Sequence, residues 1–163
     1  MTCGKYGISL NPQKSLFALE EGNLLGHIIS KDGIRIDPER IQAILQIPYP
    51  RNIKELQAFL GKINFLRRFI PNLAELIRLL SNMLKKDAKV KWSLETKQAF
   101  ESIKTALTQT PVLTSPQFDK DFIIFYFAYE HTIAVVLLQK DDQGNEKPMS
   151  FFSRALEDAP LKY

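Results

Sequence analysis

Helix start signals recur between Asp37 and Ser93, and they restrict most strongly what this chain can fold into. Asp37 precedes Pro38, and its carboxylate can accept hydrogen bonds from the free amides of a helix that begins with proline. Asn52 and Ser93 can cap further helices in the same way, and prolines separate the apolar segments. The pattern predicts a helix from Pro38, a longer one from 53 to about 69, one from after Asn72 to 84, and one from 94 to 107.

Short strands are predicted on the N-terminal side of these helices. Apolar runs at 15–19 and 24–30 surround a turn at 20–22, and the Asp32-Gly33 pair before 34–36 is a strong hairpin signal. A small β-hairpin region is therefore expected before a central α-helical region.

The sequence becomes β-rich again after Pro111. Segments 122–128 and 133–138 are dense in β-branched and aromatic residues, 148–153 supplies a third strand, and 140–147 reads as a hairpin turn. Three strands without a helix of their own predict a mixed sheet that is cut off before completion, with exposed apolar surface around 123–138. The expected fold class is α+β, in three parts: 1–36, 37–110 and 111–163.

Basic residues are concentrated in the helical region. Between Arg51 and Lys91 there are ten lysines and arginines against three acidic residues, whereas the whole chain carries a net charge of only +4. Such a block can be the footprint of a polyanion, because neutralised phosphates release counterions and drive binding. It can equally be a solvated helical surface, and charge alone leaves both interpretations open.

The sequence gives no sign of a membrane segment or of a bound metal. No apolar run approaches the roughly 20 residues that cross a bilayer, and no signal-peptide pattern is present, so an intracellular protein is expected. Cys3 is the single cysteine, which excludes an internal disulfide, and the two histidines give no zinc-binding spacing. We therefore expect neither a structural metal nor a cofactor in this chain.

The helix that begins at Ile53 has an unusual exposed face. Its apolar residues recur at spacings of three and four and predict one buried face. The opposite face gathers five other residues: Lys54, Gln57, Gly61, Phe65 and Arg68. A glycine there costs about 1 kcal/mol relative to alanine, so something is expected to approach this face closely.

Two interpretations of that face follow from its residues. A helix laid along a nucleic-acid minor groove would admit sugar edges at Gly61 and hydrogen bond to them through Gln57. Alternatively, the face is a second packing surface against a neighbouring helix, with Gly61 allowing close approach and Phe65 in the core.

The segment from 56 to 71, LQAFLGKINFLRRFIP, resembles the thumb signature of reverse transcriptases from gypsy-type retrotransposons and related plant pararetroviruses. Segments 10–14 and 25–30 resemble the strand and hairpin that position the primer terminus in that family. Segments 91–92, 99–100, 111–113 and 152–156 resemble the tether and the start of its RNase H domain. The resemblance implies that 1–36 is the end of the palm, 37–110 the thumb and connection, and 111–163 the start of a truncated RNase H-like domain.

The same resemblance assigns binding roles. In the family, the thumb helix holds the template-primer duplex through its minor groove, which implies this role for Gln57, Gly61 and Phe65. Candidate phosphate contacts are Lys54, Lys62, Arg67 and Arg68, and the primer-grip-like hairpin would contain Leu25, Gly26 and His27. The implied partners are an RNA–DNA hybrid or DNA duplex and the rest of the Pol polyprotein.

The resemblance also implies that this chain is catalytically inactive on its own. Family members carry the polymerase carboxylates upstream of the segment that begins at Leu10, and those groups hold the Mg2+ ions of the intact parent enzyme. Phe127 stands where the first metal-binding aspartate of RNase H is expected, and an aromatic ring cannot ligate magnesium. Glu130 is out of register with that position, and the Asp141-Asp142 pair reads as a solvated turn.

Three functions remain open at this point. The first is a fragment of a retrotransposon polyprotein that grips the template-primer duplex. The second is a genomic relic without function. The third is a host-adopted protein-interaction module that uses Phe65, Phe69 and Ile70 as an apolar patch.

Overall fold

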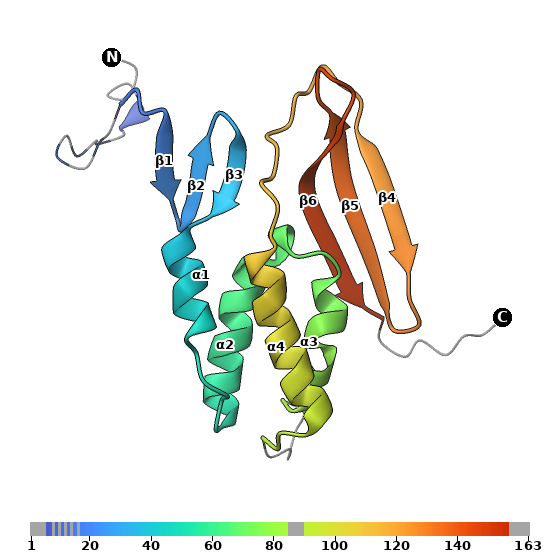
Figure 1. Cartoon of the computed structure of the whole chain (residues 1–163). Helices are drawn as coiled ribbons and strands as arrows, with labels where there is room; N and C mark the ends of the chain where they lie inside the picture. The colour runs from blue at the N-terminus through green and yellow to red at the C-terminus, as the bar shows by residue number, and fades with distance from the viewer. Residues whose placement is uncertain are drawn as a thin grey trace.

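The computed structural model describes residues 17–84 and 90–156, with the single residues 6, 7, 9, 11, 13 and 15 before them. These residues form two three-stranded sheets and a group of four α-helices (Figure 1). The α+β class is therefore confirmed. Several residues used in the sequence argument lie outside the described residues: Cys3, Leu10, Pro12, Lys14, Lys85, Lys86 and Lys89, and also 157–163.

The first sheet is an antiparallel meander of β1 (Glu21–Leu24), β2 (His27–Ser30) and β3 (Gly33–Ile36). The predicted hairpin at Asp32-Gly33 is confirmed, because Ser30 pairs with Gly33 across it. The predicted turn at 20–22 is wrong, since Glu21 and Gly22 belong to β1 and pair with β2. The described residues of 15–19 form no strand.

The true first turn of this sheet lies at Leu25-Gly26. Both residues have positive φ, +53° for Leu25 and +77° for Gly26. A leucine rarely adopts the left-handed region, so its position in an apolar run predicts a strand and conceals the turn. The expected single strand at 24–30 is therefore split between β1 and β2.

Three of the four helices begin after the predicted caps Asp37, Asn52 and Ser93, whereas Asn72 before the remaining helix makes no side-chain capping bond. The helices are α1 (Pro38–Leu45), α2 (Ile53–Phe65), α3 (Leu73–Asn82) and α4 (Leu94–Thr108). The Asp37 carboxylate accepts a hydrogen bond from the amide of Glu39 at 2.9 Å, and Asn52 Oδ1 accepts one from Glu55 at 2.9 Å. Ser93 forms a reciprocal capping box with Thr96. Helix α2 ends earlier than expected, at Phe65, and the 3-10 turn η3 (Arg67–Phe69) follows it.

The core of the molecule joins the helices to the linker after α4. Buried apolar side chains of all four helices pack with Ile36 of β3 and with Leu113 of that linker. Leu113 also pairs with Ile34: the Ile34 amide donates to the Leu113 carbonyl at 2.7 Å, and the Leu113 amide donates back at 2.8 Å. A Cβ on Gly33, whose φ is +128°, would collide with that Leu113 carbonyl oxygen, so this junction requires glycine.

The second sheet contains β4 (Ile123–Ala128), β5 (Thr132–Lys140) and β6 (Glu146–Ala155). Its described strands are all antiparallel, in the order β4-β5-β6, whereas a mixed sheet was expected. Strand β6 lies nearest to α3, and β4 forms the outer edge (Figure 1). The predicted apolar exposure is confirmed for β4, where Tyr126 is 81% exposed, but β5 is mostly buried or half-buried.

Polar contacts join β5 and β6 to the helices. The guanidiniums of Arg67 and Arg68 donate to the carbonyls of Ser153 at 3.0 Å and Met149 at 3.4 Å. In return, Ser153 Oγ accepts a hydrogen bond from the Ala74 amide at 2.9 Å, and the hydroxyl of buried Thr132 donates to Glu75 at 3.2 Å. The second sheet is therefore attached to α3 and η3 by buried and half-buried hydrogen bonds as well as by apolar contacts.

Candidate nucleic-acid interface

Helix α2 has the two faces that its sequence predicts. Leu56, Phe59 and Ile63 are fully buried against the other helices. On the other side Gln57 and Gly61 are exposed, and Phe65 is 48% exposed. The residues proposed to meet a duplex therefore lie together on one accessible strip of the helix.

Gly61 lies in a groove between α1 and α2. The groove encloses about 520 Å³ and is lined by Arg40, Ala43, Ile44, Ala58, Gly61, Lys62 and Phe65. No described atom lies within 4 Å of where a Cβ on Gly61 would be. The packing interpretation is therefore wrong for Gly61 within the described part of the chain, because no neighbouring helix uses its missing side chain.

Phe65 is held by the N-terminal sheet. The His27 imidazole lies between two aromatic rings, with centroid distances of 5.2 Å to Phe65 and 5.3 Å to Phe69. On Phe65 the guanidinium of Arg40 lies 4.5 Å from the ring centroid, a cation–π geometry. The exposed aromatic ring is thus fixed in position by β2 and α1.

The structure brings the predicted hairpin and the predicted helix face together. Arg40 donates a hydrogen bond to the Leu25 carbonyl at 3.2 Å, and a Cβ on Gly26 would lie only 2.6 Å from Arg40 Cζ. His27 contacts Phe65, as described above. Leu25 remains exposed at the tip of the turn. The two sites, which are far apart in sequence, form one continuous surface.

Burial is the main cause of a lowered pKa at His27, and the positive charges of Arg40 and Arg68 lower that pKa further. Its Nε2 atom is buried and has no hydrogen-bond partner among the described residues. The imidazole is therefore neutral near pH 7 and acts here as an aromatic spacer between Phe65 and Phe69.

The four candidate phosphate contacts divide into two pairs. Lys54 and Lys62 are exposed on α2, and no described carboxylate lies within 4 Å of either. Arg67 and Arg68 instead donate to carbonyls of β6, so part of their hydrogen-bonding capacity is used inside the molecule. Sequence reasoning missed Arg40, because no local pattern relates a residue of α1 to the exposed face of α2.

The predicted RNase H positions lie at the end of β4 and in the turn that follows it. Phe127 lies in β4 and is 50% exposed, and Glu130 lies in the following turn with His131 Nε2 at 3.8 Å. Among the described residues, no three His, Cys, Asp or Glu side chains are placed to hold a metal ion.

The predicted turn at Asp141-Asp142 is confirmed. The Asp141 carboxylate accepts hydrogen bonds from the backbone amides of Asn145 and Gln143 at 2.8 and 3.0 Å. Hydrogen bonds from Asn145, the side-chain bond first, lower the pKa of Asp141. The carboxylate thus closes the β5–β6 turn.

Comparison with known proteins defines the class of the chain. Residues 92–163 match the family described as "RNase H-like domain found in reverse transcriptase". The foamy viral protease-reverse transcriptase in complex with dsDNA superposes with a TM-score of 0.79 at 28% identity, over 93% of this chain and 32% of that one. The same enzyme in complex with an RNA/DNA hybrid gives a TM-score of 0.78 over 92% of this chain and 20% of that one.

Sequence relatives refine this class. The chain is 38% identical over 157 residues to the retrovirus-related Pol polyprotein from transposon 297 of Drosophila melanogaster, and 36% identical over 154 residues to the transposon Tf2-3 polyprotein of Schizosaccharomyces pombe. These matches cover 96% and 94% of this chain but only 14% and 12% of the relatives. The chain belongs to the reverse transcriptase and RNase H region of retrotransposon Pol polyproteins, which confirms the resemblance carried by its motifs.

No helix in the described part is long and apolar enough to cross a bilayer.

Proposed function

We propose that the exposed strip of α2, the α1–α2 groove and the Leu25-Gly26 turn form a grip for a template-primer duplex, either an RNA–DNA hybrid or a DNA duplex. The observation that carries this proposal is the open position of Gly61 between Gln57 and Phe65. A bare backbone at this point admits a sugar–phosphate edge, while Gln57 offers an amide for hydrogen bonds in the minor groove.

The electrostatics of the surface support a polyanionic ligand. Lys54 and Lys62 project from α2 without described carboxylate partners, and Arg40 adds a guanidinium over Phe65. Each phosphate that such a cation neutralises releases a counterion, which makes binding favourable and dependent on salt. The matched foamy viral structures contain dsDNA and an RNA/DNA hybrid, and these are the ligands that we propose for this chain.

The apolar patch predicted for a protein-interaction module is not present on the surface of the described residues. Phe69 is fully buried and Ile70 is 1% exposed, so Phe65 alone remains accessible of the three residues. Phe65 is also bordered by Arg40 and Lys62 in the groove. A single aromatic ring between two cations suits an anionic ligand better than an apolar protein surface.

The grip that we propose acts by holding a duplex and performs no chemistry in this chain. Phe127 occupies the position at which the family resemblance expects a metal-binding aspartate, and a phenyl ring supplies no ligand atom. The contacts assigned to α2 and the hairpin are made by amide, aromatic and cationic groups. Binding should therefore be independent of Mg2+ and should persist in EDTA, without cleavage of the RNA strand.

The test measures binding of the full chain to a fluorescein-labelled RNA–DNA hybrid at several salt concentrations. One variant changes Gln57, Gly61 and Phe65 together to glutamate. A matched control places the same three added charges on the exposed face of α4, as Gln98→Glu, Ser102→Glu and Thr105→Glu. The proposal expects salt-dependent binding that the first variant loses and the control keeps, apart from a small shared loss caused by the added negative charge.

Two results would contradict the proposal. One is absence of binding by the unmodified chain at low salt. The other is equal loss of binding in the α2 variant and the α4 control, which would mean that net charge alone determines the affinity.

A further inference from the structure

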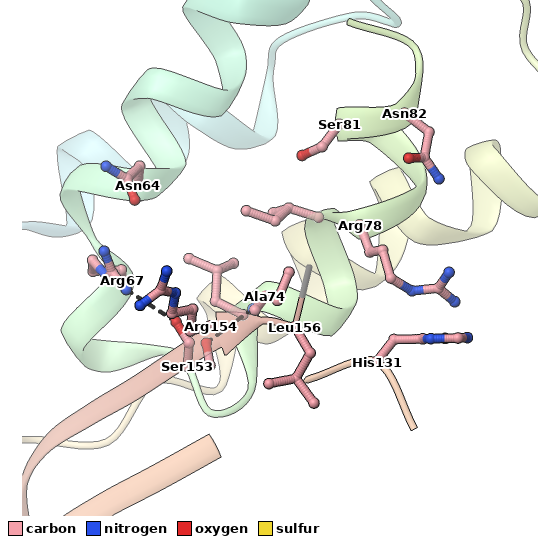
Figure 2. Close-up of a pocket in the computed structure, with 13 residues that line it drawn as sticks. Asn64, Arg67, Ala74, Arg78, Ser81, Asn82, His131, Ser153, Arg154 and Leu156 are labelled. Carbon is pink, nitrogen blue, oxygen red and sulfur yellow. Dashed lines mark hydrogen bonds between the residues drawn. The ribbon is translucent and has the colours of Figure 1, made fainter. Parts of the chain in front are cut away.

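A second concave surface lies beside α2 and is separate from the α1–α2 groove. It encloses about 720 Å³ where α2, α3 and β6 meet, and Figure 2 shows its lining. Three arginines from separate elements line it: Arg67 from η3, Arg78 from α3 and Arg154 from β6. His131 and Asn64 add further polar groups. We refer to this surface as the arginine pocket.

The charges in the arginine pocket are only partly compensated. Glu75 lies 3.3 Å from Arg78, and Glu130 lies 3.8 Å from His131. Neither Arg67 nor Arg154 has a carboxylate within 4 Å in the part of the chain that the structure describes. Like charges that converge without a counter-charge repel one another, and a bound anion removes that repulsion.

Arg67 and Arg154 are placed to act together. Arg67 donates to the carbonyl of Ser153, the residue before Arg154, and its guanidinium lies 5.1 Å from the Phe152 ring centroid. Both guanidiniums lie on the same side of the pocket in Figure 2, while Arg78 and His131 lie on the other side. One anchored and one exposed guanidinium on the same side offer several N–H donors to a single phosphate.

The position of the pocket relates it to the proposed grip. Asn64, which lines the pocket, follows Gly61 by three residues on α2 and therefore lies about one turn along the same side of the helix. We infer that the arginine pocket binds the phosphodiester backbone of a nucleic acid held on α2, through Arg67 and Arg154 with Arg78 and His131 at the opposite wall. This inference rests on the proposed function, but it concerns different residues.

The chemistry recognised here is a phosphate group, and a free phosphate compound could supply it as well as a nucleic-acid strand. A strand fits better because the pocket is open and adjoins an exposed helix that carries the proposed duplex contacts. Its arginines are also spread over three elements, which matches successive phosphates along a backbone better than one small ion.

The test compares two variants of the full chain, one that removes an arginine of the pocket and one that removes a lysine elsewhere. Arg154→Ala removes an exposed guanidinium that makes no described side-chain hydrogen bond, whereas Lys140→Ala removes an exposed cation at the opposite end of the same sheet. The hybrid is titrated with each protein over a range of salt concentrations. Arg154→Ala should lower the magnitude of the slope of log K against log salt by about 0.9 and weaken binding several-fold, and Lys140→Ala should change neither.

Identical slopes for Arg154→Ala and Lys140→Ala would overturn the inference. The α2 glutamate variant, measured in parallel, separates the two proposals. If that variant binds as the unmodified chain does while Arg154→Ala binds more weakly, the proposed grip on α2 is contradicted and phosphate binding in the arginine pocket is supported. If the α2 variant loses binding while Arg154→Ala binds as the unmodified chain does, phosphate binding in the arginine pocket is contradicted and the proposed grip is supported.

A further measurement distinguishes the two sources of phosphate. The side-chain Nε–H resonance of Arg154, assigned with Arg154→Lys, is followed by NMR during addition of the hybrid and, separately, of millimolar pyrophosphate. A shift caused by the hybrid supports the inference. A shift caused by pyrophosphate alone would overturn the assignment to a nucleic-acid strand.

Discussion

Phe65 in α2 and Tyr126 in β4 are both exposed aromatic side chains, but their surroundings differ. Phe65 stacks on His27, lies under the Arg40 guanidinium and borders an open glycine. Tyr126 is more exposed, and its neighbours along β4 include Ile124 and Phe127, which are also exposed. Within the described residues, no cation–π contact involves Tyr126 or Phe127.

This difference shows that exposure of an aromatic ring does not by itself indicate a ligand. At Phe65 the ring contacts side chains from β2 and α1, so binding loses little side-chain entropy, and the Arg40 guanidinium lies over it. At β4 the apolar side chains share an edge strand, and nothing in their surroundings favours a charged ligand. The first surface has the organisation of a binding site, and the second has that of an uncovered sheet edge.

The largest expected difference between the two surfaces is in stability. Phe69→Ala removes a fully buried ring that supports His27 from behind, and it should lower the free energy of unfolding by about 3 to 5 kcal/mol. Phe127→Ala, at a half-exposed position of β4, should cost much less, about 1 kcal/mol or below. Urea denaturation of both variants measures the difference. Equal losses of unfolding free energy in the two variants would show that the aromatic side chains of β4 are packed as firmly as those beside His27.

The next effect concerns Gly61. Gly61→Ala should stabilise α2 by up to about 1 kcal/mol, because alanine favours the helix and its Cβ meets nothing within 4 Å. The same methyl group should weaken hybrid binding roughly tenfold if a duplex approaches the backbone there, which corresponds to about 1.4 kcal/mol.

Gly22→Ala is the matched control for this prediction, since a Cβ on Gly22 also meets no described atom within 4 Å. That variant should bind the hybrid as the unmodified chain does. Tighter or unchanged binding by Gly61→Ala would show that no ligand occupies the space beside Gly61.

A smaller effect distinguishes the two aromatic side chains directly. Tyr126→Thr replaces an aromatic residue of β4 by a β-branched one that also favours strands, and it removes apolar surface. It should reduce self-association of the chain in sedimentation velocity and leave hybrid affinity within about twofold. Phe65→Thr should weaken hybrid binding and leave self-association unchanged. If both variants changed the same property, the two surfaces would not be functionally separate.

The smallest predicted effect is a dependence of stability on pH at His27. Its pKa is lowered in the folded protein, so the unfolded chain binds the proton more readily. The contribution to stability is present above the unfolded pKa of about 6.5 and is lost as the pH falls through the lower folded-state pKa.

His27→Phe keeps a ring between Phe65 and Phe69 and removes the titration. The denaturation midpoint of the unmodified chain should fall more steeply between pH 7 and pH 5 than that of this variant. His131→Gln serves as the control for the other histidine. Parallel pH profiles for the unmodified chain and His27→Phe would show that protonation of His27 does not contribute to the pH dependence of stability.

The sequence predicted the features that depend on local chemistry. Asp37, Asn52 and Ser93 cap helices through bonds to residues two or three positions later, so short windows contain the necessary information. The exposed strip of α2 was likewise predicted from helical periodicity. Family resemblance placed a hairpin at 25–27, but the local pattern predicted a strand there, because a leucine with positive φ is stabilised by tertiary contacts, among them the hydrogen bond from Arg40.

Features that depend on distant contacts could not be predicted in this way. Arg40 has no sequence relation to Phe65, and the two meet only because α1 packs beside α2. The partners of Arg67 and Arg68 lie in β6, 86 and 81 residues further along the chain. Family resemblance placed these arginines on the ligand side, whereas the structure uses them to hold the second sheet as well.

The bridge between Ile34 and Leu113 has a consequence for protein engineering. It places the beginning and the end of the helical region at one point, with hydrogen bonds of 2.7 and 2.8 Å between them. A segment whose two ends meet can be removed and inserted into a surface loop of another protein with little distortion of the host. Residues 34–113 therefore have the boundaries of a transplantable cassette that would carry the α2 strip and its groove.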